Sequence, residues 1–260
     1  MEFCEPAEVV AVTRVTPSMI RVRLRALGEW TWYADGRGDE RVDIAFPWPG
    51  ETRADVTYFN REHAGESLNE PTPPWRHYTM RAVHDRGREF DVEFVVHGDG
   101  VASTWAERAE PGHVLGIFLG STVSHAYHSP PNDAQWQLLV ADATGLPGLA
   151  RIVEELPEGV PVQAIVEVPT AADRRVIETR GDVDWTWIIG PGGRESALPT
   201  AVEGIALPET PGYAWVACES AAARSIRTHL RRRHSQPRDR HRAIGFWTAG
   251  KIGHDGRGTD

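Results

Sequence analysis

The sequence has little of several features, and each shortage excludes a class of protein. Only two of its 260 residues are cysteines, Cys4 and Cys218, which is too few for a disulfide framework. No apolar run reaches the length of a membrane span. The first residues lack the basic-then-apolar pattern of a secretory signal. We therefore expect a cytoplasmic protein without a membrane partner.

Positive charge is also scarce. The chain has 28 Lys and Arg residues against 37 Asp and Glu residues, and a net charge of -9 argues against a nucleic-acid partner. Hydrophobic residues make up 40%, which is enough to bury a core, and the length suits one large or two medium domains. Some of the ten tryptophans are candidates for an aromatic ligand site, although core packing explains most of them equally well.

The most informative stretch runs from Trp75 to His113 and begins with the hexapeptide at residues 76–81. Because side chains alternate along an extended segment, we expect a cation, an aromatic ring and a hydroxyl of this hexapeptide to share one side. Such a set suits a flavin diphosphate. Arg76 would grip a phosphate through a bidentate fork, the Tyr78 ring would lie on the isoalloxazine plane, and the Thr79 hydroxyl would hydrogen-bond near N5.

A second motif follows at residues 97–106, where Gly, Ala, Ser and Thr allow backbone N–H groups to approach a pyrophosphate closely. The alternative is an ordinary exposed hairpin with solvated arginines, and two motifs in order favour the flavin. The expected cofactor-binding residues of this half are Arg76, His77, Tyr78, Thr79, Met80, Arg81, His97, Gly100, Ala102, Ser103, Thr104 and Trp105.

Short alternating segments surround these motifs. Residues 8–29 predict two strands with a turn at 16–18, and residues 41–47 predict a third. Residues 48–75, which are polar and rich in Gly, Pro and Glu, form a long excursion before the motif strand. Several short strands with turns indicate a small antiparallel barrel, which we assign to residues 1–125.

Residues 121–133 predict a linker between domains, since they combine Gly, Ser and a Pro pair. The linker also carries His125 and His128. Two histidines without a third ligand nearby are more often solvated than metal-bound, and we expect no metal site.

The pattern changes in residues 134–260. Strands are expected at 137–141, 162–168, 185–189, 213–217 and 243–247, with helices at 148–156, within 194–206 and at 221–233. Ser220 is the expected N-cap of the last helix. Alternating strands and helices predict a mostly parallel sheet, whose ligands bind at the carboxyl ends of its strands.

Taken in order, the two motifs resemble those of the siderophore-interacting proteins. These are FAD-containing ferric-siderophore reductases within the ferredoxin-reductase-like superfamily. The resemblance covers nearly the whole chain and implies a fold of two domains, an N-terminal antiparallel β-barrel that holds FAD and a C-terminal α/β domain that meets NADPH or NADH.

The resemblance also extends to two loops that face the nicotinamide nucleotide in this family. Asp142, Thr144 and Glu219 match the family pattern, whereas Ala141, Ala143 and Cys218 depart from it. The alternative is a plain strand-to-helix turn in a domain that has lost this ligand. Arg174 and Arg175 either meet a 2′-phosphate, which would favour NADPH, or belong to a solvated loop.

The segment 245–251 resembles the family's closing motif, which would bring Trp247 near the flavin. Basic side chains that attract anionic ferric chelates in the family are altered here. Asp43 replaces a lysine, Thr248 replaces an arginine, and residues 117–120 match a third basic turn only loosely. Such losses weaken the attraction for an anion. Lys251 is the expected substrate-binding replacement, with Arg37, Arg41 and Arg53 as other candidates.

Arginines are frequent from residue 224 to residue 242. Cations near a helix C-terminus complement its dipole, so we expect a solvated helix end there.

The resemblance implies an enzyme that passes electrons from NAD(P)H through FAD to a ferric siderophore, and thereby releases iron. No covalent nucleophile or acid–base pair is needed, and none is expected. Two alternatives stay open. One is a repurposed flavoprotein that acts on an uncharged organic substrate in a biosynthetic pathway, and the other is a flavin- or siderophore-binding protein without turnover.

Overall fold

The computed structural model describes residues 3–34, 36, 38–98, 100–119, 126–233 and 237–251. Within these residues the chain divides into two compact units. The first is drawn from Met1–Gly36 and Glu40–His125, and the second from Arg37–Asp39 and Ala126–Lys251.

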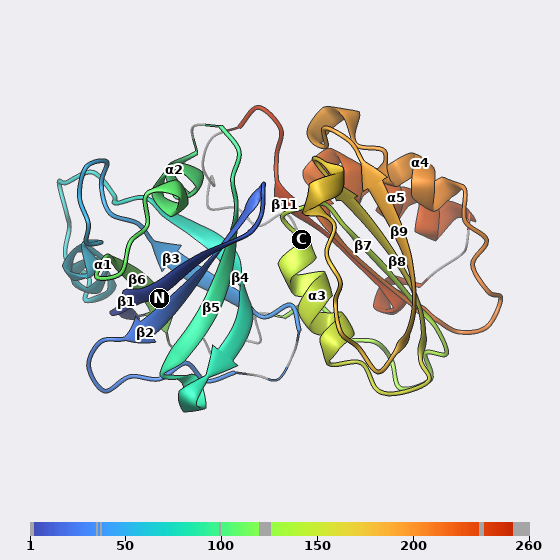
Figure 1. Ribbon diagram of the computed structural model, residues 1–260, viewed down its shortest axis with the longest axis horizontal. Helices are drawn as coiled ribbons and strands as arrows, with labels where there is room; N and C mark the ends of the chain where they lie inside the picture. The colour runs from blue at the N-terminus through green and yellow to red at the C-terminus, as the bar shows by residue number, and fades with distance from the viewer. Residues whose placement is uncertain are drawn as a thin grey trace. The chain divides into compact units, whose positions relative to one another are not determined.

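The first unit is a closed barrel of six antiparallel strands in the order β1-β2-β5-β4-β3-β6, which confirms the predicted fold class (Figure 1). Two short helices and the 3-10 turn η1 (Asp85–Gly87) accompany the strands. The strands are β1 (Phe3–Thr16), β2 (Met19–Ala26), β3 (Arg41–Ala45), β4 (Trp75–His84), β5 (Glu89–Val95) and β6 (Val114–Leu119), and the helices are α1 (Val56–His63) and α2 (Val101–Glu107).

Alternation in β2 and β5 explains why these segments form barrel walls. One face of β2 places Ile20, Val22 and Leu24 in the core, where they are almost completely buried. The other face carries three arginines, each directly opposite an acid of β5. These ion pairs are Arg21–Glu93, Arg23–Asp91 and Arg25–Glu89.

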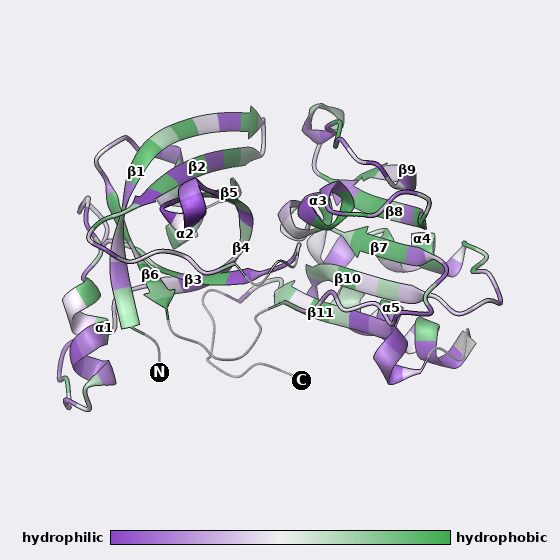
Figure 2. Ribbon diagram, turned by 90° about the horizontal axis from the view of Figure 1, so that it is seen from below, coloured by the Kyte–Doolittle hydropathy of each residue, from purple (hydrophilic) through white to green (hydrophobic). Residues whose placement is uncertain are grey.

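Two segments of the barrel are helical where the sequence predicted none. Within the excursion 48–75, Asp55 caps α1 by accepting a hydrogen bond from the Tyr58 amide (3.0 Å). Tyr58 and Phe59 then bury the apolar side of this helix. The second motif forms α2, which lies over one end of the barrel and contributes Ala102 and Ala106 to its core (Figure 2).

The second unit is a parallel five-stranded sheet in the order β11-β10-β7-β8-β9. Helix α3 packs on one face, while α4 and α5 pack on the other (Figure 1). The strands are β7 (Gln137–Ala141), β8 (Pro161–Val168), β9 (Asp182–Ile189), β10 (Tyr213–Glu219) and β11 (His241–Trp247). The helices are α3 (Leu146–Glu154), α4 (Leu198–Glu203) and α5 (Ser220–Arg233), with 3-10 turns η2 (Ala171–Asp173), η3 (Gly193–Glu195) and η4 (Arg238–Arg240).

Asp39 lies far from the rest of the second unit in sequence, yet it belongs to its core. The indole N–H of fully buried Trp215 donates to its Oδ2 (2.7 Å), and so does the amide of Tyr127 (3.0 Å). The His128 amide donates to both carboxylate oxygens, at 3.0 Å to Oδ1 and 2.9 Å to Oδ2. One acidic side chain therefore satisfies a buried donor of β10, an inner strand of the sheet, and holds the backbone at Tyr127 and His128. Among the described helices, none is long and apolar enough to cross a membrane.

Candidate functional site

The flavin motif occupies β4, and its side chains divide between two faces. Tyr78 packs against Phe94 and Phe46 at ring-centroid distances of 4.5 and 6.2 Å, so it faces the barrel core. By alternation Arg76 and Met80 share this face, while His77 and Thr79 lie on the other. The expectation that Thr79 shares a side with Arg76 and Tyr78 is therefore wrong, because neighbouring strand residues point in opposite directions.

The outward face of β4 is engaged in ion pairs. The ring of His77 pairs closely with Asp43 on β3, which also contacts Arg41 (3.2 Å). At the end of the motif, the Nε of Arg81 lies 3.7 Å from the buried carboxylate of Glu93. The side chains of His77 and Arg81 thus help to hold neighbouring strands together.

The inward face brings the cation and the ring together. The positive charge of Arg76 acts on the Tyr78 hydroxyl, although burial outweighs it and raises the pKa of Tyr78, which therefore stays protonated. The Arg76 guanidinium also donates to the Trp75 carbonyl (2.6 Å). Met80 is fully buried in the barrel core, and its amide donates to the Glu40 carbonyl (2.8 Å), so it contributes through backbone position.

The second motif folds into α2 and the loop before it. Gly100 stands at the N-cap, and no side chain caps the helix, so its first N–H groups face outward without an intrahelical acceptor. The Ser103 hydroxyl accepts the His97 amide (2.9 Å) and closes the loop onto the helix, while the Thr104 amide bonds the Gly100 carbonyl (2.8 Å).

Trp105, also on α2, provides a further test of fit. Its ring packs on Phe46 and Phe94 at 5.6 and 5.4 Å, yet its buried Nε1 has no acceptor within the described chain. A buried donor without a partner is costly. Together with the uncapped helix and the Arg76 cation, it is a donor set that fits an anionic, aromatic group such as FAD.

At the carboxyl edge of the sheet, Asp142 is the centre of a hydrogen-bond network. One oxygen accepts the Thr144 amide (2.8 Å), the Thr144 hydroxyl (2.6 Å) and the Gly145 amide (3.2 Å). The other accepts the Glu219 amide (2.9 Å) and the Trp247 indole N–H (2.7 Å). Burial raises the pKa of Asp142, and these hydrogen bonds oppose the rise.

The turn after β7 passes very close to the backbone of β10. A Cβ on Gly145 would lie only 2.1 Å from the Ala217 carbonyl oxygen of β10, so glycine is required. The structure therefore brings Asp142, Thr144 and Glu219 of the two loop motifs together, and it adds Trp247, which the closing motif placed near the flavin instead. It also shows both Asp142 oxygens engaged by the chain's own donors.

Helix α5 begins with a different cap from the one expected. The Glu219 carboxylate accepts the amides of Ala221 (2.6 Å) and Ala222 (3.2 Å), so Glu219 caps the helix. The prediction of Ser220 as N-cap is wrong, because its hydroxyl donates instead to the Trp247 carbonyl (2.7 Å). The other Glu219 oxygen accepts the Ala249 amide (3.1 Å) and holds the tail against the sheet.

The loop after β9 contributes residues that the sequence reasoning missed. Gly192 and Gly193 both have positive φ, 65° and 61°, and a Cβ on Gly193 would lie 3.3 Å from the Trp247 ring. Next to them, a guanidinium nitrogen of Arg194 lies 3.6 Å from the Cβ position of Gly250. A Gly-Pro-Gly-Gly run directly after a predicted strand was the available signal. Lys251 is exposed and directly follows Gly250, in the turn after β11.

The predicted 2′-phosphate loop has one acid that is already engaged. The Asp173 carboxylate accepts the amide (3.1 Å) and hydroxyl (2.7 Å) of Thr170 in a capping box, and it is almost fully buried. Arg174 next to it is exposed, and Arg175 is half-buried.

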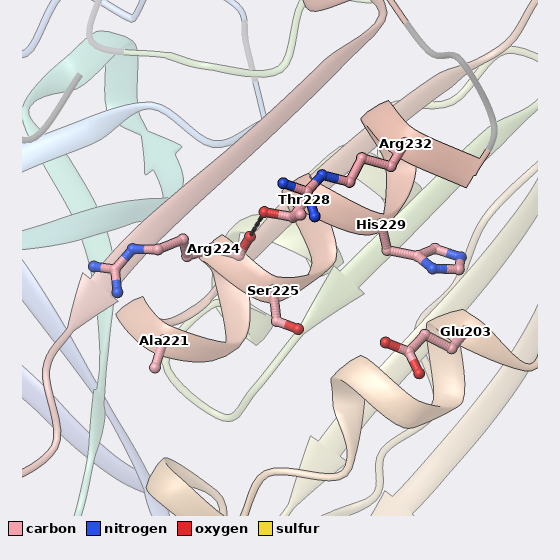
Figure 3. Close-up of a pocket in the computed structure, with 7 residues that line it drawn as sticks. All are labelled: Glu203, Ala221, Arg224, Ser225, Thr228, His229 and Arg232. Carbon is pink, nitrogen blue, oxygen red and sulfur yellow. Dashed lines mark hydrogen bonds between the residues drawn. The ribbon is translucent and has the colours of Figure 1, made fainter.

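No group of three or more His, Cys, Asp and Glu side chains in the described part of the chain is arranged to hold a metal ion. The ring of His128 contacts the Gln137 side chain (2.7 Å). His125 lies outside the described residues. A polar groove between α4 and α5, away from both motif sites in sequence, is lined by Glu203 and six residues of α5 (Figure 3).

A closed antiparallel barrel with a flavin-type donor set, followed in sequence by a parallel α/β sheet, defines a ferredoxin-reductase-like flavoprotein. Two family models match the chain. The siderophore-interacting FAD-binding domain matches residues 8–122, and the siderophore-interacting protein model matches residues 134–250. The chain belongs to the siderophore-interacting protein family.

Individual relatives agree with this assignment. Ferric vibriobactin reductase ViuB of Vibrio cholerae is 28% identical over 187 residues, which is 70% of this chain and 67% of that protein. The NADPH-dependent ferric-chelate reductase of Escherichia coli is 29% identical over 185 residues, 69% of this chain and 68% of that protein. A siderophore utilization protein from T. fusca superposes with a TM-score of 0.80 at 28% identity, covering 97% of this chain and 95% of its own.

Proposed function

We propose that this chain is an FAD-dependent reductase that passes electrons from NAD(P)H to a ferric siderophore and so releases iron. The observation that carries the proposal is the polar end of the barrel, where the uncapped α2 helix and the buried Trp105 N–H await an acceptor. When bound, FAD supplies the chemistry that side chains lack, the acceptance of a hydride and the release of single electrons. Iron held as Fe(II) is bound less tightly than Fe(III) by hard oxygen chelators.

The chain's own residues bind and orient the cofactor. Arg76 and the N-terminal amides of α2 would hold the diphosphate, because both present donors that match phosphate oxygens. Tyr78, which burial keeps protonated, would support the ring system. Thr79, His77 and Arg81 lie on or pair across the outward face, and we propose that they fix the position of β4.

The carboxyl edge of the sheet would receive the nicotinamide nucleotide. Asp142 and Glu219 would shape this edge by holding the turns after β7 and β10, since their oxygens already accept internal hydrogen bonds. Asp173 is engaged in its own capping box, and Arg174 is an exposed cation of that loop. A cation there favours NADPH over NADH.

The substrate would be held by cations of the turn that follows β11. Lys251 is exposed at this turn, and Arg194 reaches the same place from the loop after β9. Arg41, another candidate cation, is already paired with Asp43. We propose residues 1–125 as the FAD-binding domain, residues 134–260 as the NAD(P)H-binding domain, and the cytoplasm as the location, which suits two free buried thiols.

Anaerobic addition of NADPH or NADH to the purified yellow protein tests the proposal. The visible flavin absorbance should bleach rapidly, and a ferric siderophore added afterwards should restore it while a ferrous-specific dye reports iron release. Bleaching without iron release would overturn the ferric substrate. No bleaching with either nucleotide would overturn the NAD(P)H-linked reductase and support a binding protein.

One observation favours a second candidate. Asp43 is surrounded by Arg41 and His77, so this part of the barrel has little net positive charge for an anionic chelate. A flavoprotein of the same fold that acts on an uncharged organic substrate would tolerate that arrangement. Iron reduction that shows no dependence on salt would favour this reading, since charge recognition weakens with screening.

A further inference from the structure

Helix α5 contains no acidic residue among its fourteen positions, although acids outnumber bases in the whole chain. Its buried positions are Ala222, Ala223, Ile226 and Leu230. The opposite side carries four arginines separated only by small side chains. We call this set, Arg224, Arg227, Arg231 and Arg232, the arginine face.

The arginine face differs from the other arginine row of the molecule. Each arginine of β2 is paired with an acid of β5, at distances of 2.5 to 2.9 Å. No member of the arginine face has an ion-pair partner among the described residues. These charges also act on His241. Burial lowers the pKa of this histidine, and the charges of Arg231, Arg227 and Arg242 lower it further, while a hydrogen bond to the Pro237 carbonyl opposes the change.

The helix dipole explains only part of this arrangement. Cations in the last turn complement the negative C-terminal end, which accounts for Arg231 and Arg232. Arg224 stands in the second turn, close to the positive end, and Arg227 is spaced three and four residues from like charges. An isolated solvated helix gains nothing from these two, so a partner that supplies negative charge is the better explanation.

Acids lie near the helix but form no ion pair with the arginine face among the described residues. Glu203 of α4 lines the same groove as Arg224 and Arg232, although their side chains extend away from it (Figure 3). The turn η3, which contains Glu195, also packs against α5. Asp239 in η4 acts on Arg240, and Asp133 is already paired with it. The arginine face is thus positively charged over about 12 Å of the helix, from the rise of 1.5 Å per residue between Arg224 and Arg232, on an acidic protein.

We infer that the arginine face docks on an anionic lipid surface. A run of four or more cations on one exposed helix matches the charge density of anionic headgroups. The small neutral residues Ala221, Ser225 and Thr228 let the guanidinium groups reach a flat surface together. The helix has no large apolar residue on this side, so binding would be electrostatic and reversible.

The position of the arginine face favours a lipid surface over an electron-donating protein as its partner. Helix α5 starts at the carboxyl edge of the sheet, where the nucleotide would bind, and Arg231 and Arg232 lie at its opposite end. A redox partner centred on Arg231 and Arg232 would be remote from that edge, whereas a lipid surface that contacts the whole face would leave the edge open. The inference rests on the proposed function, because a reductase of imported chelates gains from holding its substrate site close to the membrane.

Vesicle sedimentation with the whole chain tests the inference. Vesicles of three parts phosphatidylcholine to one part phosphatidylglycerol should bind the parent at about 0.1 M salt and release it at about 0.5 M. Pure phosphatidylcholine vesicles should not bind it. Replacing all four arginines of the face by glutamine should weaken binding by about a hundredfold or more, at roughly fivefold per charge. Replacement by lysine should restore it.

The matched control removes the same number of charges elsewhere, through Arg53→Gln, Arg86→Gln, Arg108→Gln and Arg180→Gln. These arginines are exposed and outside α5, so this variant should bind vesicles like the parent. Equal loss in the control would show that net charge alone decides and would overturn the inference. Thermal unfolding of both variants checks that each is folded.

Two further results would overturn it. One is a parent that does not sediment with anionic vesicles. The other is tighter binding to single-stranded DNA or to an acidic protein such as a ferredoxin than to vesicles of matched charge. Iron reduction measured in solution without vesicles is a separate readout. If it is normal while vesicle binding is absent, the docking surface fails and the proposed function stands. If iron reduction is absent while vesicle binding is present, the proposed function fails, and with it the membrane role of the surface.

Discussion

The α2 end of the barrel and the carboxyl edge of the sheet differ in how many of their polar groups are already engaged within the chain. At the barrel end, the first backbone N–H groups of the uncapped helix α2 and the Trp105 indole N–H have no acceptor within the described chain. At the sheet edge, Asp142 accepts five hydrogen bonds from the chain itself. The first region therefore gains stability when it binds a ligand, whereas the second is complete without one.

The two regions therefore differ in what a substitution would disturb. In the barrel motif, the uncapped α2 amides and the Trp105 N–H have no side-chain partner to lose within the described chain. The sheet edge is held by Asp142 and Glu219, and its altered positions Ala141, Ala143 and Cys218 leave that network unbroken. Motif erosion in the second region is therefore compatible with an intact fold.

The largest effect is expected from Asp142→Ala, which removes the acceptor at the carboxyl edge of the sheet. Removing this carboxylate leaves buried donors without acceptors, each at a cost of about 1–3 kcal/mol, so we expect a loss of at least about 3 kcal/mol in the unfolding free energy. FAD should stay bound, since its donors lie in the barrel. Denaturant unfolding and the FAD content give the two readouts. Asp184→Ala, an exposed acid on β9, is the control and should cost little. An Asp142→Ala protein as stable as the parent would contradict the network's importance.

The second prediction concerns the region that awaits a ligand. Arg76→Ala should weaken FAD binding about tenfold to a hundredfold, because a charged hydrogen bond contributes about 1.5–3 kcal/mol. The parent should purify with FAD rather than FMN, since the α2 amides suit a diphosphate. Mass spectrometry of the heat-released chromophore and a flavin titration measure both points. Arg53→Ala should bind FAD like the parent, and recovery of FMN would contradict the assignment.

The third prediction concerns the ion pairs on the barrel's outer face and the pH dependence of stability. Burial alone would raise the pKa of Asp91, but hydrogen bonds from Arg23 and His84 lower it below its ordinary 3.8. A lowered pKa in the folded state stabilises the fold above pH 3.8 and loses this contribution as pH falls through the lower value. The unfolding free energy of the parent should therefore drop at acid pH, and Asp91→Asn should flatten that drop. An unchanged slope would exclude Asp91 as its source.

The fourth prediction concerns the proposed recognition of an anionic substrate, and it adds positive charge at two positions where the family resemblance implies a basic side chain. Asp43→Lys with Thr248→Arg should raise kcat/KM for an anionic ferric siderophore about fivefold to tenfold, from attraction of about 1 kcal/mol. Lys251→Ala and Arg194→Ala should each lower it by a similar factor. Steady-state kinetics at low and high salt measure the effect, which screening should reduce. If the restored protein gains nothing and the parent ignores salt, an uncharged substrate is the better account.

The smallest effect concerns α5. Because Arg231 and Arg227 contribute to the lowered pKa of His241, Arg227→Gln with Arg231→Gln should raise that pKa toward 6.5. A histidine with a lowered pKa in the folded state contributes stability above pH 6.5, and this contribution is lost as the pH falls through the lower value. The variant should therefore lose less stability under mild acid. An NMR titration of the His241 ring measures the shift directly. The same value in parent and variant would place the cause in burial alone.

The alternating strands were the most predictable part of the fold, because period-two patterns such as residues 20–24 read directly as barrel walls. Helix α1 was missed because its Asp55 cap lies inside a polar stretch that resembles a loop. Helix α2 was missed because small residues suggested a backbone cradle rather than a helix. Local composition does not show which of these states the neighbouring core will favour.

The site was predicted as a set of residues and less well as a set of contacts. Asp142, Thr144 and Glu219 lie together in the structure, since strand ends of a parallel sheet meet at one edge, and their role toward a nucleotide stays a prediction. Their hydrogen-bond partners were not predictable, because the Trp247 indole comes from a strand more than one hundred residues away. Arg194 was missed for the same reason, as its proximity to Gly250 depends on the path of a glycine-rich loop.

The engagement of Asp39 limits how this protein can be divided experimentally. A fragment that starts at residue 126 contains all five strands of the sheet but lacks the acceptor of the Trp215 indole N–H. The amides of Tyr127 and His128 would lose the same partner. Such a fragment would bury an unsatisfied donor in the inner strand β10, at a cost of about 1–3 kcal/mol, and would serve poorly in isolated-domain binding experiments. Substitutions in the whole chain are the sounder route to separate the roles of its two halves.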